Sequence, residues 1–179
     1  IHNAGTAAEV LRQVGAYSFD IILSDYHLDD GRDSQQLLEE LRQKHLISLS
    51  TIFMVITAER GYQNVVSVAE LAPDDYLIKP FTADRLQARL AKAISKKQFF
   101  ARVFEHLDNG AFADALAACE GLLDKDESFL HDTLRFKSEI LNALGRFHEA
   151  QAIYERVLAN SMVPWARMGL AIALRGLDE

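Results

Sequence analysis

The stretch Phe19-Asp20-Ile21-Ile22-Leu23-Ser24-Asp25 is an apolar run that ends on a carboxylate. Two later stretches have the same form, since residues 51–57 end on a threonine and residues 75–80 end on a lysine followed by a proline. Uninterrupted apolar runs of this length are typical of parallel strands that are buried on both faces. The carboxyl ends of parallel strands meet at one edge of a sheet, and ligands bind there. We therefore expect the carboxylate, the hydroxyl and the ammonium group to lie close together.

Asp25, Thr57 and Lys79 are the side chains at these three strand ends. Together they suit the receipt and holding of a phosphoryl group, because the carboxylate can act as the nucleophile while the other two bind the oxygens that it acquires. Each residue alone has a simpler interpretation: the aspartate as a turn or cap residue, the threonine as a β-branched strand residue and the lysine as a surface cation. The hypothesis of phosphoryl transfer rests on their combination.

The strand ends, together with Tyr76 three residues before Lys79, resemble the receiver domain of two-component response regulators. The sequences FDIILSDYHL at 19–28, TAE at 57–59 and YLIKPF at 76–81 are similar to receiver signatures. The resemblance covers residues 1–97 and implies an α/β doubly wound parallel sheet of the flavodoxin-like type. It also implies that the peptide bond before Pro80 is cis, and that Tyr76 turns inward when Thr57 moves toward a bound phosphoryl group.

A receiver also binds magnesium, and the resemblance assigns this role to the Asp25 carboxylate, the backbone carbonyl of His27 and an acidic pair that follows the first strand. This chain has neither that pair nor that strand, because residues 1–5 align with the end of the second strand of a receiver. We expect that the natural chain begins earlier and that the Mg²⁺ site is incomplete in the sequence given. An exposed hydrophobic edge on the strand at 19–25 follows from the same alignment.

Local signals predict helices between the strands. Thr6 and Glu9 have capping-box spacing ahead of a helix over 7–14, which Gly15 should end. An amphipathic helix is expected over 34–45, with Asp33 or Ser34 as its cap, and a weaker one over 61–71. The acidic residues between the first strand and the second helix are predicted to be loop and cap residues and not a metal site; these are Asp29, Asp30 and Asp33.

From residue 82 onward the pattern is helical, and Gly110, Gly145 and Gly176 are the expected breaks, 35 and 31 residues apart. These spacings are close to the 34-residue period of tetratricopeptide repeats. Residues 98–179 resemble about two and a half such repeats, an all-α domain. The packing positions of that family are matched by small and aromatic residues: Ser138, Phe147, Ala150, Tyr154, Trp165 and Gly169. The absence of glycine and proline from 84–107 predicts one nearly continuous helix through the junction.

Composition limits the functional class. The single cysteine, Cys119, excludes an internal disulfide and fits a reducing compartment. No apolar stretch approaches the roughly 20 residues that span a bilayer. A net charge of −7 argues against nonspecific nucleic-acid binding. We expect a bacterial, cytoplasmic signalling protein that acts on other proteins, without nucleic-acid or membrane partners.

The leading hypothesis is a response regulator, not an enzyme, that receives its phosphoryl group on Asp25 from a histidine kinase or phosphotransfer protein. Its output would be a protein or peptide ligand bound in a groove of the repeats, near Arg135, Glu139 and Asn142. One alternative is a scaffold that is never phosphorylated and serves as a docking module or homodimer. Another is an aspartyl-phosphate hydrolase of the haloacid dehalogenase type, which requires a second aspartate at the position of His27.

Overall fold

The computed structural model describes residues 1–58 and 72–178. The described residues up to Phe99 form one compact unit, and those from Phe100 onward form a second. No helix among the described residues is both long enough and apolar enough to cross a membrane.

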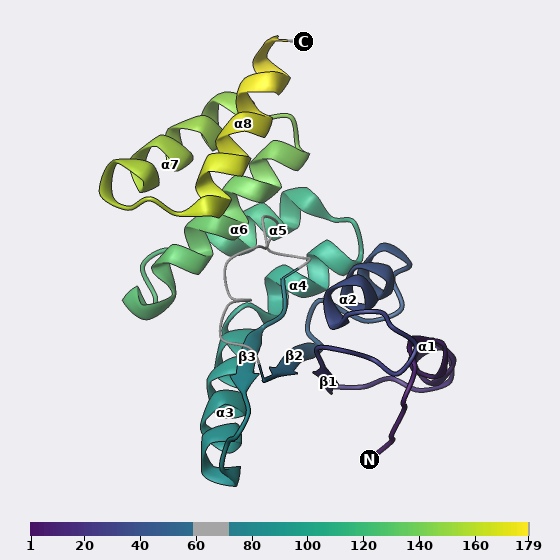
Figure 1. Cartoon of the computed structure of the whole chain (residues 1–179). Helices are drawn as coiled ribbons and strands as arrows, with labels where there is room; N and C mark the ends of the chain where they lie inside the picture. Colours follow the sequence, from purple (N-terminus) through teal and green to yellow (C-terminus); the bar gives the residue numbers. More distant parts are fainter. Residues whose placement is uncertain (59–71, 179) are drawn as a thin grey trace. The chain divides into compact units, whose positions relative to one another are not determined.

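The first unit is built on a three-stranded parallel sheet with the order β1 (Ile21–Asp25), β2 (Ile52–Thr57), β3 (Asp75–Ile78), shown in Figure 1. Asp25 is paired with Ile56, and Thr57 is paired with Ile78, so that the three strands end within one residue of each other. The parallel sheet that the apolar runs predict is confirmed.

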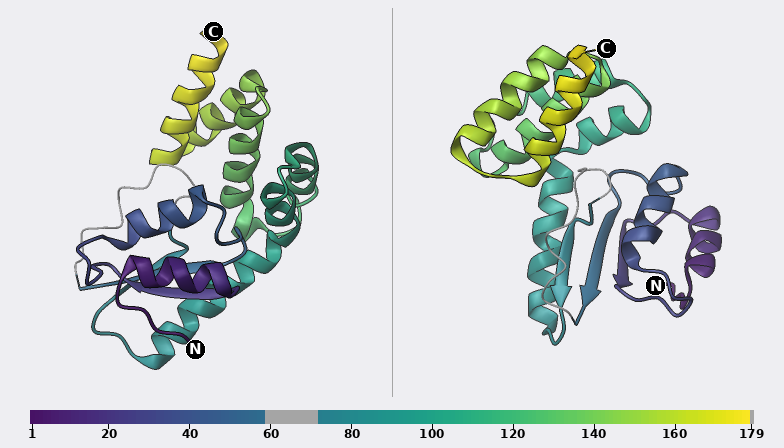
Figure 2. Two further views of the ribbon diagram at one scale, coloured as in Figure 1. Left: turned by 90° about the vertical axis from the view of Figure 1, so that its right-hand side faces the viewer. Right: turned by 45° about the horizontal axis from the view of Figure 1, so that its top comes forward.

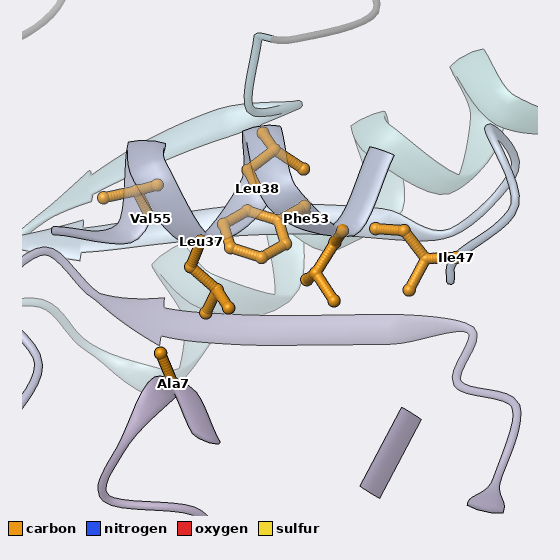
Figure 3. Packing of buried hydrophobic residues seen from close by; sticks show 7 residues of the cluster. Ala7, Leu37, Leu38, Ile47, Phe53 and Val55 are labelled. Carbon is orange, nitrogen blue, oxygen red and sulfur yellow. The ribbon is translucent and has the colours of Figure 1, made fainter. Parts of the chain in front are cut away.

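Two helices, α1 (Ala7–Ala16) and α2 (Ser34–Gln43), cover one face of this sheet. Figure 3 shows the core between them, in which α2 presents a stripe of leucines to the inward side chains of β2; its buried members are Ala7, Leu37, Leu38, Leu41, Ile47, Phe53 and Val55. The helix α3 (Ala83–Phe99) lies on the opposite side of the sheet (Figure 2). Burial on both faces explains why β2 has no polar alternation, since five of its six residues are buried.

The residues predicted to cap α1 and α2, Thr6 and Asp33, are the N-cap residues of these helices. The Asp33 carboxylate accepts a hydrogen bond from the Gln36 amide at 2.8 Å, and the Gln36 side chain returns a bond to the Asp33 amide, which completes a capping box. The Thr6 hydroxyl accepts from the Glu9 amide, but the Glu9 carboxylate binds the Gly5 amide and not that of Thr6. The helix α1 also continues through Gly15 to Ala16, so the expected stop at Gly15 is wrong. The helix expected over 61–71 lies outside the described residues.

The second unit is entirely helical, and each helix packs against the next in the chain. Its elements are α4 (Ala101–Asp108), α5 (Phe112–Glu120), a 3₁₀ turn (Glu127–Phe129), α6 (Leu130–Ala143), α7 (Phe147–Asn160) and α8 (Pro164–Asp178). Gly110 and Gly145 follow α4 and α6 with φ of 69° and 70°, a left-handed conformation that favours glycine. These two predicted breaks are confirmed.

The third predicted break, Gly176, is wrong, because α8 continues through it to Asp178. A side chain at Gly176 would overlap the ring of Phe147, and one at Gly169 would overlap the ring of Tyr154. Both rings belong to α7, so these glycines serve close helix packing and not a turn.

The single helix expected through the junction is interrupted at one residue. The backbone is helical at 95–97, as predicted, but Phe100 separates α3 from α4 with φ −95° and ψ 10°. The Phe100 side chain is fully buried, and its ring contacts those of Phe104, Phe129 and Phe136. The first helix of the second unit thus begins on a core residue of that unit.

Candidate functional site

The carboxyl ends of the three strands bring the predicted side chains together. The Lys79 ammonium donates a hydrogen bond to Asp25 Oδ1 at 2.7 Å, although the two residues come from the outer strands of the sheet. Thr57 ends the strand between them, and its carbonyl accepts a hydrogen bond from the Lys79 amide at 2.8 Å. Backbone pairing therefore brings Asp25, Thr57 and Lys79 into a row along one edge of the sheet, each one residue further along than its neighbour.

A hollow of about 210 Å³ opens at this edge, and all three side chains line it. Asp25 and Lys79 are accessible, with side chains 57% and 49% exposed, whereas Thr57 is 5% exposed. An incoming group would therefore meet the carboxylate and the cation before the buried Thr57. At this exposure the Asp25–Lys79 ion pair contributes about 0–1 kcal/mol to stability, and a ligand can displace it at little cost.

The loop after β1 is held in one conformation by backbone hydrogen bonds. The Tyr26 amide donates to the Ile56 carbonyl, the Ser34 amide donates to the Tyr26 carbonyl, and His27 pairs with Asp33 across the loop. Gly31 closes the turn with φ 81°. This arrangement fixes His27 beside the hollow, which it helps to line.

A second hollow, of about 260 Å³, lies on the other side of Asp25, between β1 and the residues that precede α1. Gly5, Leu23 and Asp29 are among the residues that line it. Both oxygens of the nearby Asp30 carboxylate accept hydrogen bonds from backbone amides, one from Ala7 and one from Arg32. The loop thereby caps the first turn of α1 from outside the helix, a contact that spacing along the sequence could not reveal.

Magnesium requires six oxygen ligands in near-octahedral geometry, several of them water. Within the described residues, no group of three or more acidic, histidine or cysteine side chains converges to hold a metal ion. Asp25 and the carbonyl of His27 are at the position that the resemblance assigns to Mg²⁺, where they could supply two of its ligands. Asp33 is a helix cap and Asp30 binds backbone amides, as expected for loop and cap residues.

Neither Tyr76 nor Pro80 lines the hollow. The Lys79–Pro80 peptide bond is cis. Tyr76 is half-buried, packs against the core cluster beneath α2 and does not line the hollow. Burial, with a smaller effect of the Asp33 carboxylate, raises the pKa of the Tyr76 phenol, so the ring stays neutral and acts as an apolar group with a hydroxyl.

In the second unit, the residues expected along a ligand groove take part in internal contacts. The Arg135 guanidinium binds Glu139 at 3.2 Å and lies 5.7 Å from the centre of the Trp165 ring. The Asn142 amide donates to the Tyr154 hydroxyl and the Gly169 carbonyl, both at 3.1 Å. These contacts join α6 to α7 and α8 and leave the three side chains half-buried, and a ligand groove near them stays a prediction.

Comparison with known proteins agrees with the strand-end geometry. The sequence profile of the response regulator receiver domain matches residues 1–91. The chain is 27% identical over 152 residues to the two-component response regulator PhoP of Pseudomonas aeruginosa, an alignment that covers 85% of this chain and 64% of PhoP. It is 36% identical over 91 residues to the DNA-binding transcriptional regulator NtrC of Escherichia coli K12, covering 51% of this chain and 19% of NtrC. The row formed by Asp25, Thr57 and Lys79 lies within the matched region, and the chain belongs to the response regulator receiver domain family.

Proposed function

We propose that this chain is a phosphoacceptor of two-component signalling, in which Asp25 receives a phosphoryl group from a phosphohistidine on a histidine kinase or phosphotransfer protein. The observation that carries the proposal is the contact of 2.7 Å between Lys79 and Asp25, with Thr57 at the end of the intervening strand. The receiver family match and the two-component relatives support the same class of partner.

The chemistry is a displacement at phosphorus. A carboxylate oxygen of Asp25 attacks the phosphorus, the bond from phosphorus to the histidine nitrogen breaks, and the imidazole leaves with the electron pair of that bond. Lys79 exchanges its contact with the carboxylate for a charge-assisted hydrogen bond to a phosphoryl oxygen. Mg²⁺, which receiver domains generally bind, would neutralise part of the negative charge, with Asp25 and the His27 carbonyl among its ligands.

The response to phosphorylation starts at Thr57. Thr57 is 5% exposed and lines the hollow, and its hydroxyl would donate a hydrogen bond to the new phosphoryl group. Tyr76 is the next residue of the proposed switch, because it is half-buried on β3, whose end also carries Lys79. A shift of Thr57 would open space toward which the tyrosine ring can turn.

The output is protein binding by the second unit, which we assign to tetratricopeptide-like repeats, and the chain is not an enzyme. Support comes from two helix pairs, α4 with α5 and α6 with α7, whose first helices end on left-handed glycines 35 residues apart. Small residues of one helix receive aromatic rings of the preceding one, as for Gly169 and Tyr154. Stacked helix pairs of this kind provide extended binding surfaces.

The test is phosphorylation by acetyl phosphate in the presence of Mg²⁺, on a protein that includes the acidic pair expected ahead of residue 1, followed by mass spectrometry of the intact protein and of its peptides. Wild type should gain one phosphate on the peptide that contains Asp25, and Asp25→Asn should gain none there. Asp20→Asn is the matched control, because it removes a carboxylate just before the other end of the same strand and should leave incorporation unchanged. Equal labelling of wild type and Asp25→Asn would refute the assignment of the phosphoacceptor.

A scaffold that is never phosphorylated makes a different prediction for the same experiment. Wild type would remain unlabelled while binding a protein partner with an affinity that Asp25→Asn does not change. The Mg²⁺ dependence of labelling distinguishes chemical acylation from receiver chemistry, because only the latter needs the cation.

A further inference from the structure

Ser34, the first residue of α2, carries a buried hydroxyl group that has no hydrogen-bond partner among the described residues. The residue is 0% exposed, and its Oγ atom makes no hydrogen bond there. Its backbone amide donates to the Tyr26 carbonyl at 2.8 Å, so the side chain is the unpaired group. Buried polar groups are nearly always hydrogen-bonded, and leaving one unpaired costs free energy. The unpaired hydroxyl indicates that a partner reaches it in another conformation of the chain.

This serine lies near the carboxyl edge of the sheet, on the face that α2 covers. Because β1 and β2 are parallel and α2 joins them, the helix begins at the carboxyl edge and runs back toward the amino edge. Ser34 is the first residue of the buried face of α2, and Leu37 and Leu38 are the next. These leucines belong to one cluster with Phe53 and Val55 of β2 (Figure 3). Ser34 therefore lies close to the end of β2.

Thr57 and Tyr76 have their side chains on the same face of the sheet as Val55. Alternate residues of a strand point to one face, so Thr57 follows Val55 on this face. Tyr76 is the partner of Val55 on β3 and packs against the same cluster. Burial, and to a smaller extent the Asp33 carboxylate, raises the pKa of the Tyr76 phenol, so the phenol lies within electrostatic range of the residue before Ser34. The region beside Thr57 is thus bordered by both the tyrosine ring and the start of α2.

We propose that Ser34 is a positioning residue for Tyr76: when the tyrosine ring turns inward, its hydroxyl group and that of Ser34 form a hydrogen bond. This inference rests on the proposed function, in which Thr57 moves toward a phosphoryl group on Asp25 and leaves the space that the ring enters. The inward conformation gains a hydrogen bond, whereas the present one keeps the serine hydroxyl unpaired. Ser34 thereby favours the phosphorylated conformation without contacting the phosphoryl group, and by linkage it strengthens the binding of that group.

The test is the affinity for beryllofluoride in the presence of Mg²⁺, measured by fluorine NMR on a protein that includes the acidic pair expected ahead of residue 1. Ser34→Ala should raise the dissociation constant of beryllofluoride about fivefold, because the bound state loses one ordinary hydrogen bond. Ser138→Ala is the matched control, since Ser138 is also 0% exposed but lies in α6 of the second unit, where its hydroxyl donates to the Arg135 carbonyl. This control should leave the dissociation constant unchanged.

A double-mutant cycle with Tyr76→Phe separates positioning from packing. Tyr76→Phe and the double variant should each raise the dissociation constant by the same factor of about five, whereas independent effects would multiply. Urea unfolding without beryllofluoride should show Ser34→Ala to be at least as stable as wild type, since no hydrogen bond of the hydroxyl is lost there.

Three results would overturn the role of Ser34: an unchanged dissociation constant in Ser34→Ala, effects that multiply in the double variant, or a Ser34→Ala protein that is destabilised without beryllofluoride. A wild-type protein that does not bind beryllofluoride at all would instead overturn the proposed function, and this inference with it. The wild-type measurement therefore distinguishes the two failures.

Discussion

Lys97 is a charged residue inside the first unit, at the end of α3. Its ammonium lies 2.8 Å from the Asp74 carboxylate and donates to the Leu49 carbonyl at 2.6 Å. The Lys97 and Asp74 side chains are only 12% and 15% exposed. Burial lowers the pKa of Lys97, and the opposing attraction of Asp74 is smaller. The pair thus holds α3 against the amino ends of β2 and β3, at a cost in desolvation.

We predict that Lys97→Met lowers the free energy of unfolding by about 2–3 kcal/mol near pH 7, because Asp74 is left without its cation. The lowered pKa also predicts a pH effect, since the unfolded chain binds more protons at this lysine than the folded chain. The contribution of Lys97 to stability therefore rises as the pH increases from its lowered pKa toward the ordinary value of 10.5.

The measurement is urea unfolding of wild type and Lys97→Met as a function of pH, and the quantity of interest is the difference between them. Lys92→Met is the control, because Lys92 is exposed on the same helix. A difference that stays constant across the alkaline range would contradict the predicted pH effect.

Cys119 illustrates how burial controls reactivity. Its side chain is fully buried in α5, and burial raises the pKa of the thiol to about 12. We predict that a thiol reagent at pH 8 labels the native chain at less than about a hundredth of the rate found in urea, because the thiolate is the reacting form. Rapid labelling of the native chain would show that Cys119 is an accessible sensor thiol.

At the scale of elements, α7 and α8 are joined by two rings and two glycines. Phe147 faces Gly176, and Tyr154 faces Gly169, so the same spacing of seven residues recurs on both helices in opposite directions. The Tyr154 hydroxyl also accepts a hydrogen bond from the Asn142 amide. The fit of the two α7 rings against the two α8 glycines sets the register of these helices and lets them approach closely.

We predict that Gly169→Ala and Gly176→Ala each destabilise the chain by about 1–3 kcal/mol, since the new methyl group overlaps an aromatic ring. Alanine otherwise favours a helix over glycine by up to about 1 kcal/mol, so the two effects oppose each other. Gly15→Ala is the matched control, because Gly15 lies within α1 and a Cβ atom there meets nothing within 4 Å. Thermal unfolding should show a lower midpoint for the first two variants and a higher one for the control.

The same glycines show where the sequence was sufficient and where it was not. The uninterrupted apolar runs predict the strands and the edge at which they end, because runs of this length are typical of parallel strands buried on both faces. A glycine that precedes a turn and a glycine that receives an aromatic ring look alike in sequence, so the sequence predicts a break at Gly176 where α8 continues. Contacts of Asp30 with α1 and of Lys97 with Asp74 join residues 23 apart in each case, and no local pattern encodes them.

At the scale of the whole molecule, the net charge bears on whether the second unit binds nucleic acid or protein. The net charge is −7, and residues 100–179 contain eight lysines and arginines against thirteen aspartates and glutamates. Nonspecific DNA binding depends on clustered cations that replace counterions of the phosphate backbone. NtrC is described as a DNA-binding regulator, but its match with this chain covers 91 residues, whereas the receiver profile already spans residues 1–91. Similarity to NtrC therefore carries no DNA-binding surface into the second unit.

We predict that the chain does not bind mixed-sequence duplex DNA at 150 mM salt, because its acidic second unit repels the phosphate backbone. Fluorescence anisotropy with a labelled duplex measures this directly, and lowering the salt concentration should not produce binding, since a basic protein gains affinity steeply as salt is removed. Full-length NtrC serves as the positive control on a duplex that contains its binding site. Affinity that rises as salt falls would show a cationic surface, and the output of the second unit would then be assigned to nucleic acid instead of protein.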